Sequence, residues 1–84
     1  MMPIDKVRGR LENAFPDDRI ELSSPQQDDN HFQLLIVSEQ FAGKSMVEQH
    51  QLVYRALGDA MREAIHALAL RTYTPEQWQK DAGG

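Results

Sequence analysis

Hydrophobic residues near the amino terminus recur at steps of three and four, which is the period of one helical face. They are Ile4, Val7, Leu11 and Phe15. Pro16 follows directly, and proline cannot continue a helix. The pattern therefore predicts an amphipathic helix over about residues 3 to 15.

Two strands separated by a polar loop are predicted next. Ile20 and Leu22 alternate with charged residues, which is typical of a short half-buried strand. Residues 23–30 are polar apart from one proline, and residues 32–37 read Phe-Gln-Leu-Leu-Ile-Val. This second run is rich in aromatic and branched residues and is apolar on both faces toward its end, so it predicts a covered central strand.

A long helix is predicted to begin after Ser45. Ser45 and Glu48 fit a capping box, in which the two side chains satisfy free backbone amides. The helical period then continues for about five turns. The apolar face is expected to pack on the sheet and contains Val47, His50, Val53, Tyr54, Leu57 and Met61. The opposite face carries Glu48, Gln49, Gln51, Arg55, Asp59 and Arg62.

Residues 64–73 are ambiguous, because alanine and leucine favour a helix while the alternation of leucines is typical of a strand. We predict a strand over about 66 to 73, since two strands need further pairing to be stable and a helix from 45 to 73 would be unusually long. Thr74-Pro75-Glu76-Gln77 fits a second capping box and predicts a short terminal helix that carries Trp78.

The predicted order is α-β-β-α-β-α, an α+β fold with helices packed on a three-stranded sheet. It forms one domain over residues 1–80, followed by a frayed tail at 81–84. A strand–helix–strand unit is parallel in nearly every case, so the second and third strands should begin at the same sheet edge. His31 and His66 open these two strands.

The composition disfavours several classes of function. The 84 residues include nine Lys and Arg against thirteen Asp and Glu, a net charge of −4 that disfavours nucleic acid as a partner. Without cysteine, the chain by itself supplies neither a thiolate nucleophile nor a Cys-based metal site. No long apolar segment indicates a membrane span or a signal peptide, so we expect a cytoplasmic protein. No catalytic constellation is present, so we expect no enzyme.

Several segments, in order and spacing, resemble proteins of the BolA family. They are His31–Glu39, Phe41-Ala42-Gly43-Lys44-Ser45, Gln49–Tyr54, Ile65-His66-Ala67-Leu68 and Tyr73–Trp78. The resemblance spans essentially the whole chain. It implies an α-β-β-α-β core related to class II KH domains.

The resemblance also implies a function. BolA-like proteins bind monothiol glutaredoxins of the CGFS type and share with them a [2Fe–2S] cluster, for cluster delivery or for iron and redox sensing. The glutaredoxin cysteine and glutathione supply thiolates, and the histidine of the Ile-His-Ala motif, His66 here, supplies an imidazole. The isolated chain is then expected to hold no cofactor and to be a monomer or a weak homodimer.

The second cluster ligand is left open by the sequence. In many family members it is a Cys or His in the loop between the first two strands, but residues 23–30 contain neither. His31 at the end of the loop is the candidate, Asp28 or Asp29 is a weaker one, and a different mode of binding is the third alternative. Taken without the resemblance, His66 and His50 are both typical of structural histidines.

The rival function is DNA binding by a transcriptional regulator, which the resemblance also suggests through a helix-turn-helix-like segment at about residues 41–62. The candidate surface carries Lys44, Arg55, Arg62 and Arg71. Two departures weaken this reading. The Gly-x-x-Gly loop of KH domains is absent, and Gln49 and Gln51 stand where many relatives have arginine. Arg71 and the third strand are also candidates for contact with a glutaredoxin.

Overall fold

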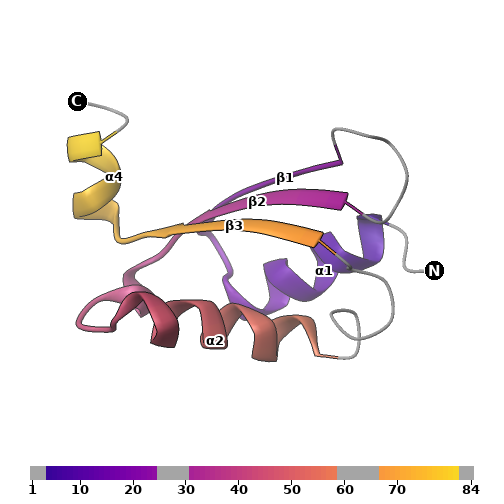
Figure 1. Ribbon diagram of the computed structural model, residues 1–84, viewed down its shortest axis with the longest axis horizontal. Helices are drawn as coiled ribbons and strands as arrows, with labels where there is room; N and C mark the ends of the chain where they lie inside the picture. The colour runs from indigo at the N-terminus through magenta and orange to yellow at the C-terminus, as the bar shows by residue number, and fades with distance from the viewer. Residues whose placement is uncertain (1–3, 25–30, 59–66, 82–84) are drawn as a thin grey trace.

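The computed structural model describes residues 4–24, 31–58 and 67–81 (Figure 1). Its elements are α1 (Ile4–Ala14), β1 (Arg19–Ser23), β2 (His31–Val37), the 3-10 turn η1 (Glu39–Phe41), α2 (Met46–Leu57), β3 (Ala67–Tyr73) and α4 (Pro75–Asp81). The predicted order of helices and strands is confirmed in these ranges. The turn η1 was not predicted.

The sheet has the order β1-β2-β3, with β1 antiparallel and β3 parallel to the central strand β2. Leu34 is in register with Leu22 on one side and with Leu70 on the other. Because side chains alternate between the faces of a sheet, these leucines form one row on the same face. The predicted parallel return of the last strand is confirmed.

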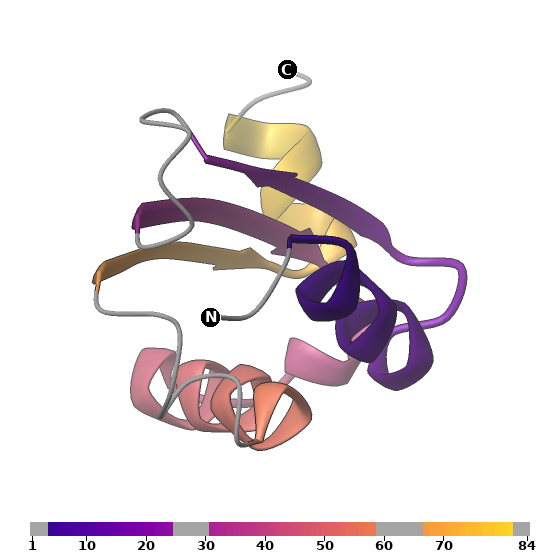
Figure 2. The same ribbon diagram turned by 90° about the vertical axis from the view of Figure 1, so that its right-hand side faces the viewer.

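Helices α1 and α2 lie on the same face of the sheet, and the core fills the space between the two layers (Figure 2). Val7, Leu11 and Phe15 are buried, as the period of the first helix predicts. The Phe15 ring packs against Phe41 of η1, with 5.5 Å between ring centroids. The remaining buried members of the core are Leu22, Phe32, Leu34, Ile36, Val53 and Leu57.

The orientation of α2 differs from the prediction at three positions. Val53 and Leu57 face the core, but Val47 and Tyr54, expected there as well, are 66% and 40% exposed. Gln49, expected on the solvent side, is only 5% exposed. The Gln49 amide is accommodated because Nε2 donates hydrogen bonds to the carbonyl oxygens of Phe41 (3.4 Å) and Lys44 (3.0 Å). Met61, predicted on the same face, lies outside the described residues.

Both capping boxes are confirmed. The Ser45 amide donates to Glu48 Oε1 at 2.8 Å, and the Glu48 amide donates to Ser45 Oγ at 3.2 Å. Thr74 and Gln77 make the same reciprocal pair at the start of α4. Each pair satisfies backbone amides that a helix leaves without an internal partner, which fixes where α2 and α4 begin.

Helix α4 is held at the end of the sheet by its tryptophan. Trp78 packs edge-to-face on Tyr73, the last residue of β3, with 5.3 Å between ring centroids. The guanidinium of Arg19 lies over the Trp78 ring, 5.1 Å from its centroid. These contacts join α4 to both outer strands.

Candidate functional site

His31 begins β2 and is half-buried at the edge of the sheet where both parallel strands start. Its register partner on β3 is Ala67. The residue that precedes Ala67 in the chain, His66, lies outside the described residues, as do Asp28, Asp29 and Arg62. The structure therefore places one of the two expected cluster ligands.

The face of the sheet that carries His31 follows from the alternation along β2. Phe32 and Leu34 are buried in the core, so His31 lies on the opposite face with Gln33 and Leu35. We call this surface the open face, and its members described on the three strands include Glu21, Ser23, Gln33, Leu35, Ala69 and Arg71. Sequence reasoning did not single out Gln33 or Leu35, although period-two alternation about Phe32 and Leu34 indicates their face.

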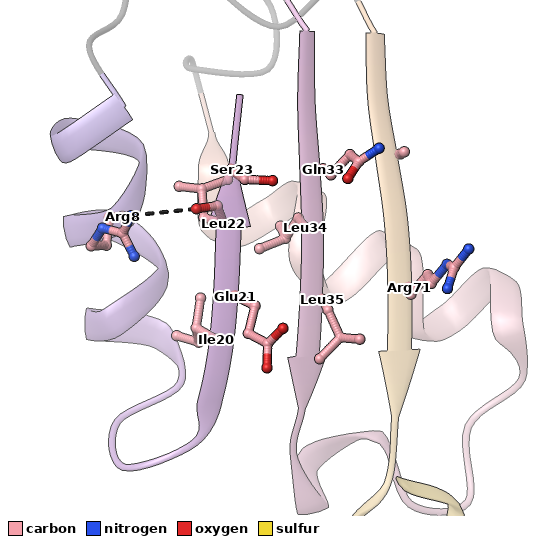
Figure 3. Close-up of a pocket in the computed structure, with 10 residues that line it drawn as sticks. Arg8, Ile20, Glu21, Leu22, Ser23, Gln33, Leu34, Leu35 and Arg71 are labelled. Atoms are coloured by element: carbon pink, nitrogen blue, oxygen red, sulfur yellow. Dashed lines mark hydrogen bonds between the residues drawn. The ribbon is translucent and has the colours of Figure 1, made fainter. Parts of the chain in front are cut away.

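A hollow of about 480 Å³ extends along the open face and around β1 toward α1 (Figure 3). Arg8 of α1 lines it on one side and donates a hydrogen bond to the Leu22 carbonyl at 3.4 Å. Glu21, Leu35 and Arg71 form one row across the strands. The Glu21 carboxylate is already paired with Arg19, at 2.6 Å to Nη2, so the hollow presents the exposed Arg71 guanidinium beside an apolar leucine.

The basic residues predicted to share one surface are not brought together. Arg71 lies on the open face, whereas its neighbour Thr72 points toward α2. Lys44 and Arg55 belong to the opposite side of the sheet, and they lie eleven positions apart along mostly helical chain, about 16 Å. Arg62 lies outside the described residues. A single basic patch built from Lys44, Arg55 and Arg71 is therefore absent from the described part of the chain.

His50 occupies a different environment from His31. It is half-buried on α2, and its ring lies edge-on to Tyr54 with 6.4 Å between centroids. Its Nε2 is buried without a hydrogen-bond partner. The position on a packed helix agrees with the structural role that the sequence favours for this histidine.

The donor set decides what kind of iron–sulfur site fits this chain. Cysteine is absent from the whole sequence. Among residues 4–24, 31–58 and 67–81, no three His, Asp or Glu side chains gather as a metal site. A [2Fe–2S] cluster needs four ligands. The residues therefore fit a cluster whose thiolates come from another molecule, and do not fit one held by this chain alone.

Helices in the described ranges are all too short and too polar to cross a bilayer.

Comparison with known proteins settles the family. The profile of the family described as "BolA-like protein" matches residues 12–77, most of the chain. This chain belongs to the BolA-like family. The matched range includes every element from the end of α1 to the first turn of α4, with His31 and His66 among its residues.

Curated relatives carry two kinds of name. The DNA-binding transcriptional regulator BolA of Vibrio cholerae is 45% identical over 56 residues, which cover 67% of this chain and 53% of that protein. BolA-like protein 1 of Mus musculus is 33% identical over 82 residues, covering 89% of this chain and 60% of the mouse protein. The chain thus spans between half and two thirds of the length of these two relatives.

Solved structures share the fold. The solution structure of BolA1 from Mus musculus superposes with a TM-score of 0.80 at 31% identity, covering 96% of this chain and 72% of that one. A crystal structure of a Bol-like protein from Babesia bovis gives 0.81 at 27% identity, with 95% and 93% coverage. The α+β architecture is therefore that of known BolA proteins. The relation to class II KH domains stays a prediction.

Proposed function

We propose that this chain binds a monothiol CGFS glutaredoxin and shares with it a glutathione-containing [2Fe–2S] cluster, for cluster delivery or for sensing of iron and redox state. His66 supplies one imidazole ligand, and His31 is the candidate for the second. The glutaredoxin cysteine and glutathione supply the thiolates that this chain lacks.

The observation that carries the proposal is the register of the two parallel strands. His31 is paired with Ala67, the residue that follows His66 in the sequence. Adjacent strands lie about 4.8 Å apart. We therefore infer that the two imidazole-bearing residues serve one sheet edge, although they lie 35 positions apart in the sequence.

Imidazole ligation gives the shared cluster distinct properties. Replacing thiolates by imidazoles on one iron raises the reduction potential, as in Rieske centres. Imidazole must be deprotonated to bind metal, and histidine titrates near neutral pH. The mixed complex is therefore expected to lose its cluster in mild acid more readily than a cluster held by thiolates alone.

Co-expression with a CGFS glutaredoxin tests the proposal. We expect a coloured one-to-one complex whose visible absorption and circular dichroism differ from those of the glutaredoxin homodimer. His66→Ala should abolish this spectrum, and His31→Ala should change it or shorten its lifetime. His50→Gln is the matched control, because it removes an imidazole from α2, which packs on the face of the sheet opposite to His31. Its spectrum should equal the wild-type spectrum.

Two results would overturn the assignment. A colourless mixture, or only the homodimer spectrum, would remove the shared cluster as the function. A normal spectrum in His66→Ala, from a complex of unchanged stoichiometry, would remove His66 from the ligand set while leaving the partnership intact.

DNA binding is the second candidate, and the names of relatives favour it: the Escherichia coli protein, 29% identical over 94% of this chain, is also a DNA-binding transcriptional regulator BolA. Against it, the net charge is −4, and residues 41–58 contain a single α-helix. A titration of duplex DNA at increasing salt separates the two functions. Phosphate contacts give affinity that falls steeply with salt and needs neither glutathione nor iron.

A further inference from the structure

The outer face of α2 carries two exposed hydrophobic side chains. Three large hydrophobic residues of the described chain are exposed, namely Met46 at 59%, Val47 at 66% and Tyr54 at 40%, and all three lie on this helix. Met46 faces β3, where its Sδ lies 3.8 Å from the Thr72 hydroxyl, whereas Val47 and Tyr54 face away from the sheet. Hydrophobic residues of this size are normally scattered singly over a surface. Their concentration on one helix requires an explanation beyond the core packing of α2.

The spacing on this face is that of a helix-pairing seam. Val47, Gln51, Tyr54 and the helix-ending Gly58 are separated by four, three and four residues, and all are exposed. Steps of four and three place side chains along one line of a helix, as in the contact line of a coiled coil. We call these four residues the outer stripe.

The charges beside the outer stripe are self-complementary. Glu48 and Arg55 lie on the same flank, seven residues or two helical turns apart. When two copies of α2 pair antiparallel about a two-fold axis, Glu48 of each copy faces Arg55 of the other. In the same register, Val47 lies opposite Gly58 and Gln51 lies opposite Tyr54, whose hydroxyl is a hydrogen-bond partner for the amide.

We propose that the outer stripe of α2 is a self-association surface, whose occupant is a second copy of this chain bound antiparallel through Val47, Gln51 and Tyr54 and paired by Glu48 with Arg55. One surface patch serves both copies, as a two-fold interface requires. The inference is independent of the proposed cluster function, because none of these residues is a candidate cluster ligand.

The size of the surface sets the strength of the association. Helix α2 has 12 residues, about 18 Å of helix. A stable interface buries about 800 Å² on each partner, which one face of such a helix does not supply. The dimer is therefore weak and in rapid exchange, and becomes populated only at high protein concentration.

The test combines sedimentation velocity with amide NMR spectra of the isolated chain between about 20 µM and about 1 mM protein. Concentration-dependent shifts should be confined to residues 46–58. Gln51→Leu extends the apolar seam and should tighten the dimer about tenfold. Gln79→Leu makes the same substitution at an exposed position of α4 and should leave sedimentation unchanged.

A charge cycle tests the register. Arg55→Glu places like charges opposite each other twice and should weaken the dimer about fivefold at low salt. Glu48→Gln retains a capping residue at its position. In that background Arg55→Glu should have much less effect, because no carboxylate faces it.

The proposal fails if Gln51→Leu and Gln79→Leu sediment alike, or if concentration shifts map to the open face instead of α2. It also fails if the α2 amides respond to duplex DNA and show no dependence on protein concentration.

Discussion

The hydroxyl of Thr72 donates a hydrogen bond to Gln49 Oε1 at 2.5 Å, and this bond joins α2 to β3. Both residues are buried, Gln49 with 5% and Thr72 with 4% of its surface exposed. The Nε2 group of the same Gln49 amide donates hydrogen bonds to the carbonyl oxygens of Phe41 and Lys44. One side chain therefore connects β3, the helix and the turn that leads into it.

Replacing Gln49 by Leu should destabilise the fold by about 2–3 kcal/mol, because the buried Thr72 hydroxyl loses its acceptor and the Lys44 carbonyl loses its donor. Urea unfolding at neutral pH measures the change. Gln51→Ala, on the exposed side of the same helix, is the control and should lie within about 0.5 kcal/mol of wild type. Equal stabilities of the two variants would contradict the role of the buried amide.

The capping box gives α2 a dependence on pH. The backbone amide of Ser45 donates to the Glu48 carboxylate and holds the pKa of Glu48 below its ordinary value, and the Ser45 side chain and the charge of Lys44 act in the same direction. A lowered pKa in the folded state stabilises it above the ordinary glutamate pKa of about 4.3. This contribution is lost as the pH falls through the lower, folded pKa.

The expected result is a stability difference between wild type and Glu48→Gln that is constant near neutral pH and declines in acid. Unfolding curves at about pH 7 and about pH 3 measure it. An identical difference at both values would show that ionisation of Glu48 makes no contribution.

Two glycines with positive φ differ in their surroundings. At Gly58, φ is +56° and an added Cβ would lie 3.1 Å from Arg10 Nη1, which donates to the Leu57 carbonyl. At Gly43, φ is +74° and the space is open. We expect Gly43→Ala to cost about 1 kcal/mol of backbone strain and Gly58→Ala to cost more, since the Arg10 contact must also shift. Chemical denaturation of both variants measures the two losses of stability. A larger loss in Gly43→Ala than in Gly58→Ala would contradict the prediction.

Arg71 offers a test of how the open face takes part in binding the glutaredoxin. Reversing its charge by Arg71→Glu should weaken affinity for the apo-glutaredoxin severalfold, because the guanidinium lies exposed on the face that also carries His31. Arg55→Glu, on α2, makes the same charge change on the other side of the sheet. Calorimetric titration of both variants should separate them, and unchanged affinity in Arg71→Glu would exclude this surface.

Much of the fold could be predicted because the spacing of apolar residues and the positions of capping residues indicate the same helix and strand boundaries. Ser45 and Thr74 fix helix starts locally, and the ambiguous segment before Thr74 forms a strand because β2 needs a parallel partner. The exchange of Val47 and Gln49 could not be predicted. A polar side chain is buried there because three groups distant in sequence satisfy its amide, which no helical period reveals.

The candidate site was only partly predictable for the same reason. Strand order and handedness placed His31 at the start of a parallel pair, as found. The basic residues share only their positive charge, and alternation along β3 turns Arg71 and Thr72 to opposite faces. A surface patch depends on how layers stack, so charge counts along the chain do not determine it.

The central claim is that an imidazole of this chain binds iron in a cluster shared with a glutaredoxin. The most direct measurement is electron–nuclear double resonance of the reduced complex, prepared with this chain alone labelled with ¹⁵N in its histidines. The account predicts ¹⁵N hyperfine couplings that disappear in His66→Ala and persist in His50→Gln. A cluster signal without any ¹⁵N coupling in the labelled wild-type complex would contradict it.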